Sequence, residues 1–343
     1  MKKNLRKIGM FAIAITVLTS CKKDSNPQPV IVLGDTVQSI YLIGNNAYVM
    51  VNGSAKIEVF ATESFINGYF VNNEGNFGSA NGSISFVDQG NSSEEVDITP
   101  FHINTINVVS PRYMSKVSNS KAYVTDWGIN GVQVIDLLTN TISSTIACGA
   151  GPEGILVANG FAYVCNVGGW GLDNTVSVIN TSTDAVETTL VVGDKPNSVV
   201  VDVNGAVWVL TGGYTEYDSD WNVISETAGN LVKIVGNTIE ATYAFAVGNH
   251  PEDLVIDASG TTLYYSDGSW SKAVYAFNIN DEKLPTSALI DKSFYGLGVN
   301  NGYVYGTDAI DFTQSGWSYK FTTDGTIIDS VQVGIIPGGY SFN

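Results

Sequence analysis

Histidine and cysteine are nearly absent from this chain, which has 2 and 3 of them among 343 residues. A zinc or iron site built on several histidines needs more of the first, and a disulfide scaffold needs more of the second. The chain also lacks the Gly-x-Ser-x-Gly motif that marks the nucleophile of many hydrolases. Catalysis therefore has little support, and we expect a protein that is not an enzyme and has no metal or cofactor of its own.

Basic residues are scarce as well, with 16 Lys and Arg against 33 Asp and Glu. Four of the basic residues lie within the first seven positions, so the rest of the chain has 12 basic residues and a net charge of −21. A surface this acidic repels nucleic acid. We therefore exclude nucleic acid as a partner.

Long hydrophobic runs are missing too, since the apolar run near the N-terminus spans only Ile8 to Leu18. At about 1.5 Å per residue, such a run reaches about half the hydrocarbon thickness of a bilayer. The basic residues before it and the sequence Leu18-Thr-Ser-Cys21 after it are typical of a bacterial signal peptide. We predict a signal peptide over residues 1–20 and a tether over residues 21–37.

The residues that end at Cys21 resemble the lipobox of bacterial lipoproteins. This resemblance implies cleavage before Cys21 and lipidation of that residue, so that a lipid anchor provides the contact with the membrane. The expected location is the outer membrane, at the cell surface. An ordinary secretory peptide followed by a chance cysteine is the alternative.

Helical periodicity is absent after Cys21, and a repeat takes its place. Each copy has a proline or a substitute for it, an apolar strand, a turn, and an aromatic-rich strand. Successive anchors lie 41, 44, 55, 43 and 43 residues apart. The long interval places an insertion of about eleven residues within 212–229. The anchors are Pro111, Pro152, Pro196, Pro251, Phe294 and Pro337.

A period near 43 residues with short alternating strands is typical of a β-propeller blade. Two further units, from Gln38 and from Asn67, precede the anchored copies. We therefore predict an all-β, seven-bladed propeller of four-stranded antiparallel blades over residues 38–343. Residues 337–343 are left as a single strand, which we expect to close the ring.

Two stretches resemble known propellers. Asn174-Thr-Val-Ser-Val-Ile-Asn180 and the Gly193-Asp-Lys-Pro196 turn resemble the YVTN repeat of YncE-like proteins, which implies the propeller fold. Asn73-Glu-Gly-Asn76 together with Leu33-Gly-Asp35 resembles surface lipoproteins of Bacteroidetes, BtuG-like cobalamin-binding propellers among them. That second likeness implies a cobamide ligand and a TonB-dependent outer-membrane transporter as partner.

The chain departs from those lipoproteins in the order of its first two units. The unit at 33–65 precedes the unit at 67–102, whereas the relatives have the reverse order. Residues 337–343 would then have to pair with the second unit rather than the first. The sequence offers no physical reason for the exchange.

Aromatic residues gather after the second strand of several copies. In a propeller the loop after strand two and the loop that enters the next blade lie on the same side, so these residues are expected on one face. Flat indole rings suit a broad ligand, and neighbouring carboxylates would fix its polar edges. The predicted ligand-binding residues are Trp127, Trp170, Tyr214, Trp221, Trp270, Trp317, Asp126, Asp267 and Asp308.

Each of these residues also has a structural interpretation. The tryptophans would pack between blades as wedges, and the aspartates would bond backbone N–H groups in turns. A Ca²⁺ site on the same carboxylates is a further alternative. His250, next to Pro251, is expected to serve a turn.

The leading interpretation is a cell-surface lipoprotein that binds a small bulky ligand and passes it to the transporter. The first alternative is a propeller enzyme of lyase or lactonase type that uses loop carboxylates. The second is a scaffold for protein–protein contact.

Overall fold

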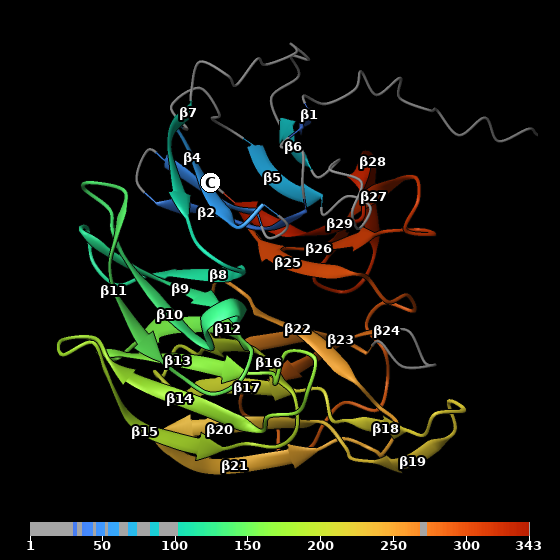
Figure 1. Ribbon diagram of the computed structural model, residues 1–343. Coiled ribbons are helices and arrows are strands. Elements are labelled where there is room, and N and C mark those ends of the chain that lie inside the picture. Colours follow the sequence, from blue (N-terminus) through green and yellow to red (C-terminus); the bar gives the residue numbers. More distant parts are fainter. Residues whose placement is uncertain are drawn as a thin grey trace, which may run out of the picture.

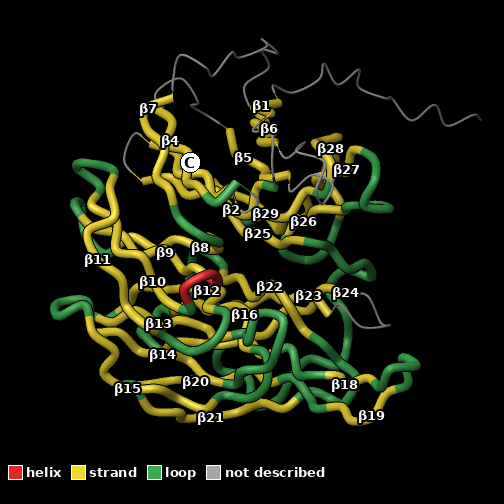
Figure 2. Tube along the Cα trace, in the orientation of Figure 1, coloured by secondary structure: helices red, strands yellow, loops and turns green. Residues whose placement is uncertain are grey.

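The computed structural model describes eight stretches of the chain, and it contains strands, turns and one short helical turn (Figures 1 and 2). No helix in these stretches is long and apolar enough to span a bilayer. Cys21 and the signal peptide lie outside the described residues. The described stretches are 30–32, 36–43, 46–51, 54–61, 68–73, 83–88, 102–267 and 273–342.

The fold is a β-propeller of antiparallel sheets, and six of these sheets have four strands. Three of the six follow the chain in order. They comprise β8 (Pro111–Lys116), β9 (Lys121–Asp126), β10 (Gly131–Asp136) and β11 (Thr141–Ala147); β12 (Pro152–Ala158), β13 (Phe161–Asn166), β14 (Thr175–Asn180) and β15 (Ala185–Val191); and β25 (Gly296–Asn300), β26 (Tyr303–Asp308), β27 (Ser315–Thr322) and β28 (Ile327–Ile335).

In the first of these three sheets, the helical turn η2 (Trp127–Ile129) follows β9. A fourth four-stranded sheet has a hairpin inserted between its second and third strands. The sheet comprises β16 (Pro196–Val201), β17 (Val207–Thr211), β20 (Asn230–Val235) and β21 (Thr238–Ala244), and the hairpin is β18 (Thr215–Tyr217) with β19 (Val223–Glu226). The insertion predicted within 212–229 is therefore confirmed as this hairpin.

The last two four-stranded sheets exchange strands with respect to chain order (Figure 1). One contains β2 (Val37–Ile43), β3 (Asn46–Val51), β4 (Lys56–Ala61) and β7 (His102–Asn107). The other contains β29 (Pro337–Phe342), β5 (Gly68–Asn73), β6 (Ser83–Asp88) and β1 (Val30–Val32). The chain thus leaves one sheet after β4, forms β5 and β6 in its neighbour, and returns to complete the first sheet with β7. β1 falls within the stretch predicted to be a tether.

The closing strand behaves as the sequence predicted. β29 pairs antiparallel with β5, with Tyr340 opposite Val71 and Phe342 opposite Tyr69. Around the axis, β29, β2, β8, β12, β16, β22 and β25 are the inner strands, and each contacts the next. The C-terminal strand therefore joins the two ends of the chain into one ring.

The prediction of seven four-stranded blades is wrong in number, because six sheets have four strands. The unit from Pro251 forms a three-stranded sheet of β22 (Pro251–Ile256), β23 (Thr262–Asp267) and β24 (Ala273–Asn278). The chain after β24 makes a single bridge between Val274 and Ile290. Pro285 lies in that segment and has no N–H to donate, which opposes a full outer strand.

The hydrophobic core lies between neighbouring sheets. The second strands carry its largest side chains, such as Trp208, Tyr123 and Tyr265, which are at most 2% exposed. Trp208 donates from its indole Nε1 to Asp202 Oδ2 at 2.9 Å and packs against Phe277 of the next sheet. Packing between sheets thus holds the inner strands around the axis, where the candidate site lies.

Candidate functional site

A proline begins most inner strands and pairs with the last residue of the second strand. Pro111 lies opposite Asp126, and Pro152 opposite Asn166. Pro196, Pro251 and Pro337 have the same arrangement. The entrance of each inner strand and the loop after its second strand therefore lie on one side of the ring, as the sequence predicted.

The strand register shifts near the start of six inner strands, as in a β-bulge. The shifts fall after Val37, Pro111, Pro152, Pro196, Glu252 and Pro337. Such bulges re-aim nearby side chains. Here the second residue of each of these strands lines a cavity of about 510 Å³ at the axis. We call five of them the axial ring: Gln38, Arg112, Glu153, Asn197 and Glu252.

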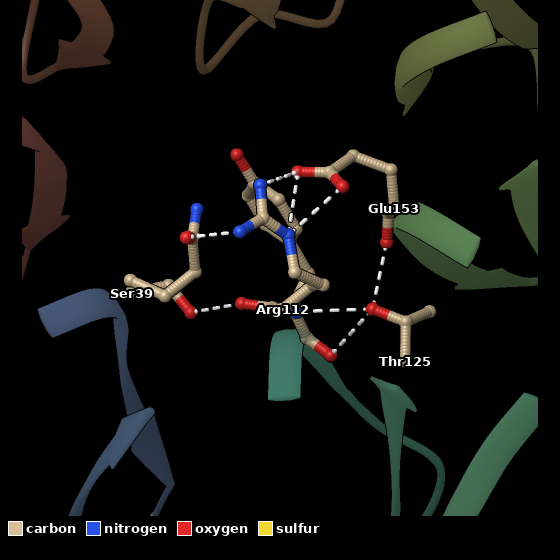
Figure 3. A network of polar contacts seen from close by, with 6 residues as sticks. Ser39, Arg112, Thr125 and Glu153 are labelled. Carbon is tan, nitrogen blue, oxygen red and sulfur yellow. Dashed lines mark hydrogen bonds and ion pairs between the residues drawn. The ribbon is translucent and has the colours of Figure 1, made fainter. Parts of the chain in front are cut away.

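Arg112 and Glu153 form the strongest pair in the axial ring (Figure 3). Arg112 Nη2 lies 2.7 Å from Glu153 Oε1, and Arg112 Nε lies 2.9 Å from Glu153 Oε2. Arg112 Nη1 also donates to Gln38 Oε1. This geometry is bidentate, so it fixes the planes of both groups. The charge of Arg112 is thus matched within the cavity.

The backbone below this pair is held by hydroxyl groups (Figure 3). Ser39 Oγ donates to the Arg112 carbonyl at 2.5 Å, and Thr125 Oγ1 donates to the Glu153 carbonyl at 2.7 Å. Thr125 also accepts from the Tyr113 N–H at 3.0 Å. These contacts tie three neighbouring sheets together at the axis, so the pair sits on a rigid support.

Tyrosines form much of the cavity wall. Tyr41, Tyr113 and Tyr340 line it, and burial raises the pKa of each phenol. Their hydroxyls therefore stay neutral at physiological pH and can donate as well as accept hydrogen bonds.

A smaller cavity of about 260 Å³ adjoins the first and shares Val167, Asn197 and Glu252 with it. Lys195 and His250 line this second cavity. Burial lowers the pKa of the Lys195 ammonium, whose Nζ donates to the Gly171 carbonyl at 2.5 Å.

His250 connects the base of the β18–β19 hairpin to the second cavity. Its Nδ1 lies 2.7 Å from the Gly212 carbonyl, and its Nε2 lies 3.1 Å from Glu226 Oε1. The ring therefore holds the loop that follows β17 against the end of β19. This arrangement agrees with the turn role expected for His250.

Of the predicted aromatic residues, Trp127 lines the axial cavity. Arg112 Cζ lies 4.3 Å from the centroid of the Trp127 ring, which is a cation–π geometry. The indole Nε1 of Trp127 is buried and has no hydrogen-bond partner among the described residues. Trp170 packs edge-on against Trp127 with centroids 6.2 Å apart, yet is 98% exposed. These two residues form an aromatic pair at the cavity rim.

The other predicted aromatic residues do not join this pair. Tyr214 lines the second cavity. Trp221 follows β18, is 82% exposed and packs against Tyr217. Trp317 lies within β27 opposite Asp308 rather than in a loop. Trp270 lies outside the described residues.

The predicted aspartates hold loops together. Asp126 is fully buried and accepts from the N–H groups of Val109 at 3.0 Å and Ser110 at 2.8 Å. Asp267 is buried and accepts from Asn249 Nδ2 at 3.1 Å. These contacts favour the turn-forming interpretation of both residues.

Asp308 differs because it has a cationic partner, Lys292 Nζ, at 2.7 Å. Burial works against ionisation, but the hydrogen bond from Lys292 and that from the Ile310 N–H lower the pKa of the Asp308 carboxyl.

For the Ca²⁺ alternative, the described residues contain no cluster of three or more His, Cys, Asp or Glu placed to hold a metal ion.

Sequence reasoning missed the axial ring, although a signal was present. The residues after Pro111, Pro152, Pro196 and Pro251 are all polar, whereas a glycine follows Pro337. A polar residue at the same point of successive repeats indicates a shared environment. The prediction used the tryptophans of the loops after the second strands and not the single residues that follow the prolines.

No protein-family model matches this chain, and no curated protein does. Solved structures match it over most of its length. Hydrazine synthase of Kuenenia stuttgartiensis covers 92% of this chain and 91% of its own, at 11% identity and a TM-score of 0.60. A quinoprotein alcohol dehydrogenase-like protein of Bacteroides thetaiotaomicron matches 90% of this chain and 68% of its own, at 15% identity and a TM-score of 0.58.

A protein of unknown function from Desulfotomaculum acetoxidans covers 90% of this chain and 89% of its own, at 15% identity and a TM-score of 0.55. At these identities the likeness shows the fold alone. The chain is therefore similar in fold to these proteins, and the resemblance to YncE-like and BtuG-like propellers stays a prediction.

Proposed function

We propose that the protein binds a small polar ligand in the axial cavity. The observation that carries this proposal is the cavity of about 510 Å³, lined at one level by the axial ring. Small-molecule sites have this size, and they combine aromatic walls with a few well-placed polar groups. Arg112 and Glu153 are already held in place by bonds to each other and to Gln38, so a ligand would meet an ordered site.

In this proposal the protein is a surface lipoprotein that hands its ligand to a TonB-dependent outer-membrane transporter. The lipobox at Cys21 and the Bacteroidetes-type motifs support this role. A cobamide remains the ligand that the resemblance implies. Such a ligand would lie across the rim against Trp127 and Trp170, with a polar edge toward the axial ring.

Replacement of Trp127 by alanine tests the site. We expect the affinity for a bound ligand to fall by ~1–3 kcal/mol, the range for loss of an aromatic anchor. Cobinamide and cyanocobalamin are titrated first and oligosaccharides next, with intrinsic fluorescence and calorimetry as readouts. Trp221→Ala is the matched control, because Trp221 is 82% exposed and does not line the cavity. Equal losses in the two variants would contradict an axial site.

Replacement of Cys21 by serine tests the anchor. Without the thiol there is no acylation, so the protein is expected to leave the membrane fraction or to stay unprocessed. Fractionation and the mass of the mature N-terminus give the result. Membrane retention at the wild-type level, with normal processing, would show that lipidation is not the anchor.

A further inference from the structure

Glu252 differs from the other members of the axial ring. Gln38 and Glu153 both accept hydrogen bonds from Arg112, while Asn197 donates from Nδ2 to the Pro251 carbonyl at 3.0 Å. The side chain of Glu252 makes no hydrogen bond or ion pair with any described residue. It is therefore the member of the ring whose polar group is left for a ligand.

The Glu252 side chain is exposed to the water of the cavity, although many protein atoms lie around it. Burial therefore raises the pKa of its carboxyl; His250 opposes the rise, and the negative charge of Glu153 adds to it. A ligand that covered the carboxylate would displace this water, and the charge would then need a cationic group of the ligand as its partner.

The surroundings of Glu252 suit a positive charge. It lines both cavities, whereas Lys195 and His250 line the smaller one, and in the larger one Arg112 is already paired with Glu153. Tyr113, Trp127 and Tyr295 contribute aromatic rings to the larger cavity, and such rings attract cations through their faces. A neutral or anionic ligand would leave the carboxylate without a partner.

We propose that the ligand carries a protonated amine and that Glu252 is the group that recognises it. This inference rests on the proposed binding function and narrows it to cationic ligands. The amine would donate to the Glu252 carboxylate at the junction of the two cavities, and the apolar part of the ligand would lie against the aromatic wall. Charge-assisted hydrogen bonds of this kind are about twice as strong as neutral ones.

Three probes of nearly equal shape test the charge. Phenethylamine, 2-phenylethanol and phenylacetate are titrated calorimetrically into the detergent-purified full chain. We expect phenethylamine to bind at least about tenfold more tightly than the other two. Glu252→Gln should lose this preference. Glu282→Gln removes the same charge from a position that lines neither cavity and should keep the preference.

Melting temperatures check that Glu252→Gln is folded. We expect no large change, since the substitution removes no hydrogen bond or ion pair of the side chain. Equal binding of the amine and the alcohol to the wild type would overturn the inference, as would a preference that survives in Glu252→Gln. If phenylacetate, 2-phenylethanol or a corrinoid binds and depends on Trp127 while the amine does not bind, the proposed binding function stands and the amine specificity falls.

Discussion

Removal of residues 337–343 is expected to abolish cooperative folding. β29 supplies the inner strand of the sheet that contains β5, and no other described strand occupies that place. Tyr340 and Phe342 also pack against Tyr69 and Tyr305, with ring centroids 5.0–5.8 Å apart. Truncation would remove Tyr340 and Phe342, expose the rings of Tyr69 and Tyr305, and leave β5 with an unpaired edge. Circular dichroism and calorimetric melts would detect the loss.

Tyr340→Phe is the control for this truncation. It keeps the ring and removes the hydroxyl that lies 2.9 Å from Ser318 Oγ. We expect a cost of about 1 kcal/mol, the usual net value of one hydrogen bond. A truncated chain that melted in one transition within a few degrees of the wild type would show that ring closure does not depend on β29.

Arg112→Met is expected to destabilise the protein by about 3–5 kcal/mol, because it leaves the Glu153 carboxylate buried without its cation. The two side chains are 16% and 10% exposed, so water offers little compensation. A chain of this size should then melt roughly 5–10 °C lower. Chemical denaturation at pH 7 measures the free energy of unfolding.

The double variant Arg112→Met with Glu153→Met distinguishes the attraction between the two charges from the free energy that their removal from water costs. Both charges are then absent, and replacing a buried ion pair with apolar side chains is often neutral or stabilising. We expect most of the lost stability to return, while ligand binding is lost. If the double variant were as unstable as the sum of the single variants, the pair would not be energetically coupled.

Much of the fold could be predicted from the repeats. The anchors Pro111, Pro152, Pro196 and Pro251 each begin an inner strand, because proline has no N–H and suits the start of a strand. The closing role of residues 337–343 also followed, since a strand left over from a repeat needs a partner. The pairing of this strand with the unit at Asn67, implied by the exchanged order, is confirmed as well.

The candidate site was less accessible to sequence reasoning. Trp127, Trp170 and Trp221 follow second strands or belong to the insertion, as predicted, but only the first two lie together. Loop length and backbone path decide where such a side chain points, and neither is encoded by a repeat. Asp126 shows the converse, because its position after a strand fits both a ligand site and the hydrogen bonds that bury it.

The sequence by itself determined the all-β repeat, the points where inner strands begin, and the acidic net charge. Those features depend on local pattern and composition. Only the tertiary structure decided that the unit from Pro251 has three strands and that Arg112 and Glu153 pair at the axis. It also decided that Glu252 lies in the same cavity as Arg112 and Glu153 and that its side chain bonds no other described residue, because the inner strands bring residues 41 or more positions apart to one axis.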